Sequence, residues 1–183
     1  MAPRKGTAQR TWWRIAVLLL LLVLAACGGE KGEKPLTEAD LKKAREYFER
    51  GNALASQGAA KAEEAVRAYK EAIKINPKFA EAYNALGLVQ RGRQQFTEAR
   101  RSFAKAIEIN PQYAEAYKNL GFAYYVDGIL DKAIENYQKA IEIDPDYGEA
   151  YYYLGKAYVG QGKLAEARKF IRKAKELGFT PKF

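Results

Sequence analysis

The sequence predicts an all-α solenoid of stacked helix pairs, and three observations support this fold class. The run Ala-Tyr-x-x-Leu-Gly returns every 34 residues, at 82–87, 116–121 and 150–155. Apolar residues between these runs recur three and four positions apart, which is the spacing of amphipathic helices. The sequence carries no strand signal. A fixed period of this length is typical of repeats that each bury one face against the next.

Composition argues against catalysis. The 183 residues include no histidine and a single cysteine, Cys27. Histidine and cysteine supply most general bases, nucleophiles and metal ligands, and the sequence has neither a Gly-rich phosphate loop nor a nucleophile elbow. An enzyme would depend on carboxylates alone, and these are not grouped as an active site requires. We therefore predict a protein that is not an enzyme and that uses no cofactor, no metal and no small-molecule substrate.

Residues 1–26 are typical of an export signal. Four basic residues lie before Ile15, and the first acidic residue is Glu30. The apolar run from Ile15 to Ala26 is shorter than the roughly 20 residues of a membrane-spanning helix, but it suits a signal peptide. The run ends in Leu-Ala-Ala-Cys, which resembles the lipobox of bacterial lipoproteins. This resemblance implies cleavage before Cys27 and a covalent lipid on its sulfur.

The same resemblance implies a place in the bacterial cell envelope. Two or more acyl chains on Cys27 would give stable membrane anchoring. Gly28 follows the cysteine, and its presence in place of aspartate favours the periplasmic side of the outer membrane over the cytoplasmic membrane. Residues 27–36 are polar and glycine-rich, which predicts a flexible tether. A cleaved or retained signal without lipid is the alternative.

The positive charge of the chain belongs partly to this leader. The formal net charge is +9, and four of the 31 basic residues but none of the 22 acidic ones lie in residues 1–26. The remaining +5 is moderate, so we predict no nucleic-acid partner. Several of the remaining basic residues lie between Lys163 and Leu177. We interpret that segment as a solvated cap, with anionic lipid or an acidic partner as the alternative ligand.

The rest of the chain divides into helix pairs. The first helix is predicted from the N-cap Thr37 to about Gln57. Asn-Pro or Asp-Pro dipeptides at 76–77, 110–111 and 144–145 separate the pairs, and we expect each Asn or Asp to cap the following helix, with proline in its first turn. The predicted boundaries are 37–79 for the extended first helix and repeat 1, 80–113 for repeat 2, 114–147 for repeat 3, and 148–183 for repeat 4 with the C-terminal tail.

The residues that recur resemble the signature of the tetratricopeptide repeat (TPR) family. In repeat 2 they are Tyr83, Leu86, Gly87, Ala99, Phe103, Ala106 and Pro111. Repeats 3 and 4 carry equivalents of most of them, and repeat 1 is more diverged, with two extra residues near Ala59. The resemblance covers about Ala44 to Leu177 and implies a right-handed α-solenoid of four TPR helix-turn-helix repeats.

Glycines inside the predicted helices indicate close packing. A helical glycine costs about 1 kcal/mol relative to alanine, so a compensating contact is expected. We expect the paired helix to approach these glycines at a small residue in each repeat, with the large aromatic side chains filling the neighbouring gaps. The predicted contacts are Gly87 with Ala99, Gly121 with Ala133, and Gly155 with Ala167.

TPR proteins bind peptides or partner domains in a concave groove lined by the first helix of each pair. Carried over by position, the predicted groove residues are Phe48, Asn52, Asn84, Leu88, Arg91, Lys118, Phe122, Tyr125, Tyr152, Lys156 and Val159. This mixture suits an extended segment with apolar side chains and some negative charge. Packing between repeats is the alternative role for the aromatic members.

Some TPR proteins hold a partner's C-terminal carboxylate with a clamp of lysine, asparagine and arginine. Asn52 matches one clamp position, but Phe48 replaces the lysine, and Glu115 and Asn119 occupy later positions. We conclude from the sequence that this clamp is absent.

The resemblances together predict a lipid-anchored adaptor or assembly factor with a protein or peptide partner in the cell envelope. Pilus biogenesis, outer-membrane assembly and peptidoglycan-enzyme scaffolding are candidate processes, and the sequence does not choose among them. The alternatives are a soluble or signal-anchored TPR protein that binds an anionic partner, and a non-catalytic subunit of an enzyme complex. The oligomeric state is not predicted.

Overall fold

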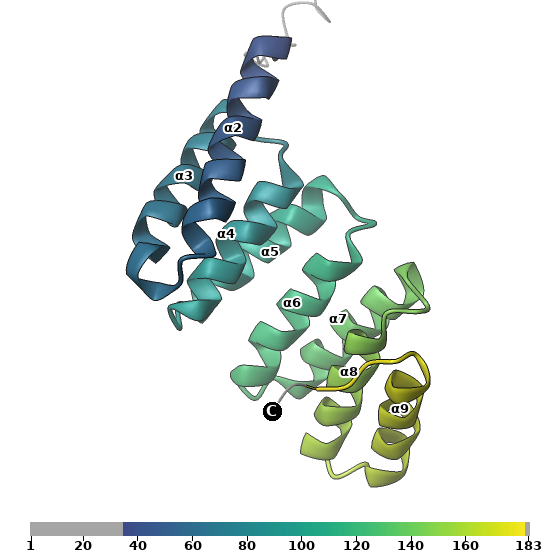
Figure 1. Cartoon of the computed structure of the whole chain (residues 1–183). Helices are drawn as coiled ribbons and strands as arrows, with labels where there is room; N and C mark the ends of the chain where they lie inside the picture. Colours follow the sequence, from purple (N-terminus) through teal and green to yellow (C-terminus); the bar gives the residue numbers. More distant parts are fainter. Residues whose placement is uncertain (1–34, 182–183) are drawn as a thin grey trace, which may run out of the picture. The chain divides into compact units, whose positions relative to one another are not determined.

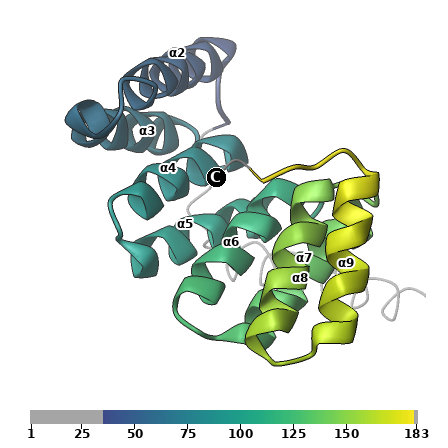
Figure 2. The same ribbon diagram turned by 60° about the horizontal axis from the view of Figure 1, so that its bottom comes forward.

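The computed structural model describes residues 35–181, which form eight α-helices and one 3₁₀ turn without any strand (Figures 1 and 2). The helices are α2 (Glu38–Ala55), α3 (Ala62–Ile75), α4 (Ala80–Gly92), α5 (Phe96–Ile109), α6 (Ala114–Val126), α7 (Leu130–Ile143), α8 (Gly148–Gly160) and α9 (Leu164–Glu176), with the 3₁₀ turn η1 at Ala59–Lys61. The predicted signal peptide, Cys27 and the tether up to residue 34 lie outside the described residues. No helix in the described range is long and apolar enough to cross a membrane.

The helices pack as four consecutive pairs, α2 with α3, α4 with α5, α6 with α7, and α8 with α9. The second helix of each pair also packs against the first helix of the next pair, and the first helices α2, α4, α6 and α8 contact one another in order. We call the surface lined by these four helices the inner face. The predicted all-α solenoid of stacked pairs is confirmed for the part of the chain that the structure describes.

The N-terminus of α2 is closed by a capping box. Asp40 N donates to Thr37 Oγ1 at 3.1 Å, and Thr37 N donates to Asp40 Oδ2 at 3.0 Å. These two hydrogen bonds satisfy two backbone N–H groups at the start of α2, where the N–H groups have no partner within the helix. The N-cap predicted at Thr37 is confirmed.

The prediction for the Asn-Pro and Asp-Pro dipeptides was wrong. The next helix begins only at Ala80, three residues beyond Pro77. Asn76 instead ends α3, and its Oδ1 accepts from Lys78 N at 3.0 Å. The same turn recurs at Asn110 and Asp144. The short side chain closes a local turn between the repeats, so the proline lies in that turn and not in the following helix.

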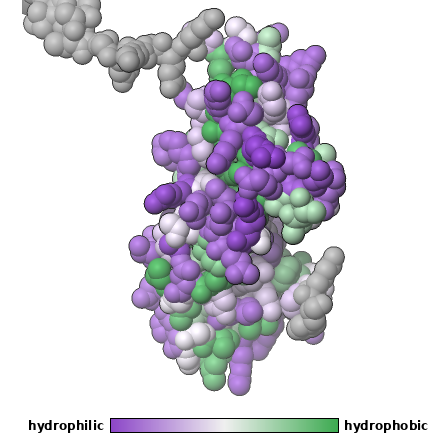
Figure 3. Space-filling view, turned by 90° about the vertical axis from the view of Figure 1, so that its left-hand side faces the viewer, coloured by the Kyte–Doolittle hydropathy of each residue, from purple (hydrophilic) through white to green (hydrophobic). Residues whose placement is uncertain are grey.

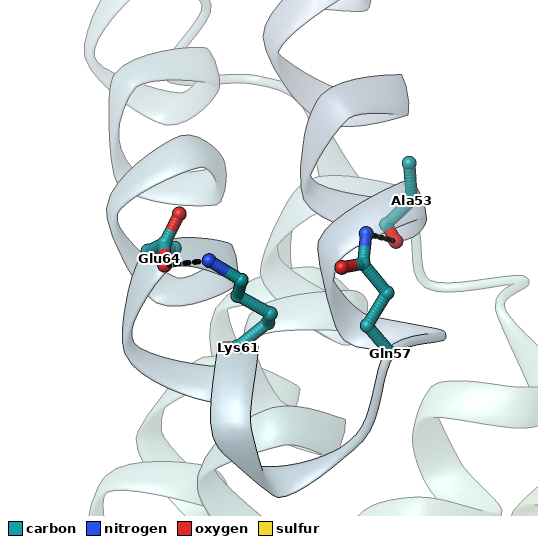
Figure 4. Close-up of polar contacts among 4 residues, drawn as sticks. All are labelled: Ala53, Gln57, Lys61 and Glu64. Carbon is teal, nitrogen blue, oxygen red and sulfur yellow. Dashed lines mark hydrogen bonds and ion pairs between the residues drawn. The ribbon is translucent and has the colours of Figure 1, made fainter.

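The two extra residues of repeat 1 form a longer turn between α2 and α3, shown in Figure 4. Gly58 takes a φ of 80°, which places the turn in the left-handed region that glycine tolerates. Gln57 Nε2 donates to the carbonyl oxygen of Ala53 at 3.0 Å. Lys61 Nζ contacts Glu64 Oε1 at 2.7 Å, and this hydrogen bond lowers the pKa of the Glu64 carboxyl. Side chains of the turn therefore bind both helix ends.

The helical glycines make room for a large side chain of the paired helix. A Cβ placed on Gly87 would lie 2.6 Å from Cε1 of Phe103, and one on Gly121 would lie 2.8 Å from Cε1 of Tyr137. These aromatic rings are the groups nearest to the two glycines. At Gly121 the carbonyl oxygen of Ala133 comes next, at 3.1 Å from the same point. The paired helix therefore approaches Gly121 at Ala133, the residue named from the sequence, while the ring of Tyr137 fills the neighbouring space; at Gly87 the three nearest atoms all belong to Phe103.

The remaining glycines of this type follow the same rule. At Gly155 the nearest atom is Cγ1 of Ile171, at 2.6 Å, followed by the carbonyl oxygen of Ala167 at 3.1 Å. Gly51 in repeat 1 is equivalent, since its Cβ would lie 2.5 Å from Tyr69 Cε1. Each glycine thus admits a large side chain from the second helix of its own repeat.

The last helix differs from its counterparts on the face that would receive a further repeat. Ile134 in α7 is buried, whereas Arg168, its equivalent in α9, is exposed. Lys175 likewise replaces Ile141 and is exposed.

Figure 3 shows the side of the molecule that lies to the left in Figure 1. Hydrophilic residues dominate this side, and hydrophobic ones form separate patches.

Candidate functional site

Most of the predicted groove residues lie on the inner face with side chains that are partly open to solvent. Val159 is 49% exposed. Eight others are intermediate in burial, namely Phe48, Asn52, Leu88, Arg91, Phe122, Tyr125, Tyr152 and Lys156. They come from successive turns of α2, α4, α6 and α8, because residues three and four apart share one side of a helix. The structure therefore brings nine of the eleven predicted residues to a partly accessible surface.

Asn84 and Lys118 are exceptions, because they are buried between repeats. Asn84 is 3% exposed, and its side chain donates to the Tyr113 hydroxyl at 3.2 Å and accepts from Asn119 Nδ2 at 3.0 Å. Lys118 is 7% exposed and lies 3.1 Å from Glu149 Oε2. A buried polar group needs such partners. These two residues connect neighbouring repeats, so the prediction that they face a ligand was wrong.

An aromatic residue near the end of each repeat contacts the first helix of that repeat. The ring of Phe79 lies 5.0 Å from that of Phe48, and the Tyr147 ring lies 5.9 Å from Lys118 Nζ. In repeat 4 the tail residue Phe179 takes this role, with its ring 5.4 Å from Tyr152. Sequence reasoning missed these contacts, although aromatic residues at 79, 113 and 147 follow the repeat spacing.

Several cations of the inner face lie on aromatic rings, among them Arg91 and Lys156. The Arg91 guanidinium is 5.0 Å from the centre of the Phe122 ring. Lys156 Nζ is 5.8 Å from the Tyr125 ring and 5.9 Å from the Tyr152 ring. Such contacts are attractive because the ring face carries partial negative charge. They hold the cations over the surface without neutralising them.

Two tyrosines at one repeat position differ in their hydrogen bonds. The Tyr69 hydroxyl donates to Asn52 Oδ1 at 2.8 Å. Tyr137 is the equivalent residue of repeat 3, where Phe122 replaces that asparagine, and its fully buried hydroxyl has no hydrogen-bond partner among the described residues. Burial raises the pKa of Tyr69 to about 12 and raises that of Tyr137 as well.

Tyr153 stacks on Tyr137, with 6.0 Å between the ring centres. The sequence did not predict this contact.

The structure has two further hollows, one away from the inner face and one at its edge. One of about 710 Å³ lies against α8 and α9 and is lined by two aromatic residues, four cations, Ala165 and Glu176. Another of about 300 Å³ lies beside the turn between α2 and α3 and is lined mainly by alanine and glycine, with Leu88 at its border. Within residues 35–181 no group of three or more His, Cys, Asp or Glu side chains could hold a metal ion.

Comparison with known families agrees with this architecture. The family profile described as "TPR repeat" matches residues 44–92, 90–128 and 127–162, and the profile described as "Tetratricopeptide repeat" matches residues 148–178. A search among curated proteins finds no match.

Solved structures extend the comparison. A crystal structure of MamA is 33% identical with a TM-score of 0.69, and the alignment covers 77% of this chain and 81% of MamA. The first TPR domain of Spaghetti (RPAP3), bound to the HSP90 peptide SRMEEVD, is 25% identical with a TM-score of 0.64 and coverages of 66% and 94%. PilF of Pseudomonas aeruginosa shares the fold at 21% identity, with a TM-score of 0.70 and coverages of 76% and 63%.

The family profiles together span well over half of the chain, and they fall on the helix pairs described above. TPR proteins are in general non-catalytic scaffolds for protein interaction. The chain belongs to the tetratricopeptide repeat family and has the architecture of a protein-interaction scaffold.

Proposed function

We propose that this protein is a lipid-anchored, non-catalytic adaptor of the bacterial cell envelope that holds a segment of a partner protein on its inner face. The observation that carries the proposal is the inner face itself. It presents partly exposed aromatic rings beside cations, and such a surface combines apolar area with charge, as binding hot spots do. The peptide bound to the TPR domain of RPAP3 supports a peptide-like partner for this chain as well.

The anchoring part of the proposal rests on the sequence. The basic leader, the short apolar run and the small residues before Cys27 occur together in the order of a lipoprotein signal. A lipid on Cys27 would confine the repeats near the membrane and raise their effective concentration towards a partner in the same compartment. Modest affinity at the inner face would then be sufficient.

Metabolic labelling tests the anchor. Cells that express the full chain are grown with radioactive palmitate and then separated into membrane and soluble fractions. We expect label on the native protein and its recovery with the outer membrane, whereas Cys27→Ser should carry no label. A native protein without label, found in the soluble fraction, would contradict lipid anchoring.

Site-specific cross-linking tests the binding surface. A photoreactive amino acid replaces Val159 on the inner face in one variant and the exposed Gln138 on α7 in the control. We expect illumination of intact cells to give a discrete cross-linked product with the Val159 variant only. Equal products from both variants, or none from either, would contradict partner binding on the inner face.

A further inference from the structure

We propose that α9, the last helix of the array, docks on an anionic phospholipid surface. The surface concerned is the exposed side of α9, which we call the basic end. It goes beyond the proposed function, because it is a surface other than the inner face, and it rests on that function only for a membrane within reach of the repeats. The cations of the basic end are Arg168, Lys169, Arg172, Lys173 and Lys175.

α9 carries more positive charge than any other helix of residues 35–181. It has five cations and two carboxylates, those of Glu166 and Glu176. At the other end of the array, α2 has four cations and four carboxylates (Figure 1). An exposed end helix therefore stays in water without net charge, so solvation alone does not account for the excess of cations on α9.

The cations of the basic end also have no carboxylate partners. In α7, Lys139 Nζ lies 2.5 Å from Glu142 Oε2, and repeat 2 has the same pair. Lys173 and Glu176 are the equivalent residues of repeat 4, but no ion pair joins them. Within residues 35–181, no ion pair involves any cation of α9. These cations can therefore receive anionic groups from outside the chain.

Apolar side chains lie among these cations. Leu164 is 54% exposed and Ile171 is 37% exposed. Towards α8, the ring of Phe170 stacks on those of Tyr151 and Tyr158, with 6.4 Å and 5.4 Å between the ring centres. Half-buried tyrosines and exposed aliphatic side chains beside cations are typical of surfaces at the headgroup level of a membrane. The hollow of about 710 Å³ lies on this side of α9, and its four cations suit the phosphate of a headgroup.

The charges at the two ends of the array argue against a second copy as the occupant. Inside the array, Leu154 packs in one cluster with Ile134 of the preceding repeat. The equivalents of these two residues at the free ends are Arg50 on α2 and Arg168 on α9, and both are exposed. Head-to-tail stacking of two chains would therefore bury two arginines against each other, and like charges repel.

A membrane is the occupant that the proposed anchor supplies. Residues 27–36 reach at most about 35 Å when fully extended, so a lipid on Cys27 would keep the repeats beside the bilayer. Anionic lipids attract clustered lysines and arginines, and each cation near such a surface strengthens binding about fivefold. Five cations within eight residues form a dense patch, which a plane of repeated phosphates can neutralise as a whole.

Lysine footprinting tests this docking on the full chain. The protein is mixed with vesicles of phosphatidylcholine, with or without about one third phosphatidylglycerol, treated with an amine-reactive reagent and analysed by mass spectrometry. We expect Lys169 and Lys175 to react at least about threefold more slowly on the anionic vesicles, because contact with the lipid shields them. The exposed Lys70 on α3 is the internal reference and should react equally on both. Added salt should remove the difference, because it screens exposed charges.

Charge reversal identifies the surface. In the variant Arg168→Glu with Arg172→Glu, Lys169 and Lys175 should react equally on the two kinds of vesicle. The matched control Lys70→Glu with Arg101→Glu makes the same change in net charge at exposed positions of α3 and α5, and it should retain the protection. Circular dichroism checks that both variants remain folded, and the comparison of vesicles on the native chain needs no variant.

Three outcomes would overturn the inference. The first is equal reaction of the α9 lysines of the native chain on both kinds of vesicle, and the second is an equal effect of the two charge reversals. The third is protection by native envelope membranes but not by lipid vesicles, which would identify an acidic protein as the ligand. The proposed function fails separately, because it depends on the palmitate label and on the cross-link at Val159, and neither is measured with these vesicles.

Discussion

The Tyr69 hydroxyl donates its hydrogen to Asn52, 17 residues earlier, and so joins the second helix of repeat 1 to the first. Repeat 3 keeps the tyrosine as Tyr137 but has Phe122 where the acceptor would be. One repeat position therefore holds a satisfied hydroxyl in one copy and, in another, a buried hydroxyl without a hydrogen-bond partner among residues 35–181. The pair allows the contribution of the hydrogen bond to be measured within a single protein.

Removing these two hydroxyls should have opposite effects on stability. Tyr69→Phe should lower the free energy of unfolding by about 1 kcal/mol, because it removes a hydrogen bond. Tyr137→Phe should leave it unchanged or raise it by up to about 1 kcal/mol, because it removes a buried polar atom that has no hydrogen-bond partner in the described part of the chain. Urea unfolding followed by circular dichroism measures both changes. A similar loss in the two variants would contradict this account.

Adding a methyl group at Gly121 should be costly. A Cβ there would lie 2.8 Å from the Tyr137 ring and 3.1 Å from a backbone oxygen, so the paired helices would have to move apart. We expect Gly121→Ala to lower the free energy of unfolding by roughly 1–3 kcal/mol, despite the better helix propensity of alanine. Gly92→Ala is the control, since nothing lies within 4 Å of its Cβ position. The control should be neutral or slightly stabilising, and an equal loss in both variants would exclude packing as the cause.

The tail residue Phe179 should contribute to the stability of repeat 4. It contacts the Tyr152 ring, and its Cβ lies 2.9 Å from the position a Cβ would take on Gly148. We expect Phe179→Ala to lower the free energy of unfolding by about 1–2 kcal/mol. Phe103→Ala should cost about 3–5 kcal/mol, because that ring is fully buried. Denaturant unfolding ranks the two, and an unchanged midpoint for Phe179→Ala would show that the tail contributes nothing.

Alkaline pH should unfold the protein through its buried tyrosines. Burial raises the pKa of Tyr69 to about 12 from an ordinary value of 10.0. The folded state therefore keeps this proton longer than the unfolded chain does, so its contribution to stability is complete below pH 10 and is lost between pH 10 and 12. For a shift of this size the linked change is about 2–3 kcal/mol. Urea unfolding at pH 8 and pH 11 should show the loss, and Tyr69→Phe should show less of it; an equal loss in that variant would contradict the assignment.

The sequence predicts the helix pairs well because the repeat signature is local and periodic. Leu86, Gly87 and Phe103 recur at fixed spacing, and their spacing alone indicates two helices that pack together. The export signal predicted for residues 1–26 lies outside the described residues and stays a prediction.

Side-chain contacts between repeats could not be predicted in the same way. Asn84 is buried because Tyr113 and Asn119 reach it from residues 29 and 35 positions later, and no local pattern indicates that meeting. Phe179 belongs to a tail that departs from the period, so its contact with Tyr152 was not expected. Positions that face a neighbour and positions that face solvent share the same helical spacing, and only the structure separates them.

The bond between Asn84 and Asn119 and the ion pair of Lys118 with Glu149 have a consequence for how this array could change in evolution. Each joins one copy to the next by a donor on one side and an acceptor on the other. The four copies have the same backbone fold, but the contacts between neighbouring copies are not interchangeable. A gene rearrangement that exchanged repeats 2 and 3 would keep every helix and still leave a lysine and an asparagine buried opposite the wrong neighbours. The order of the copies is thus as much a part of the protein as their number.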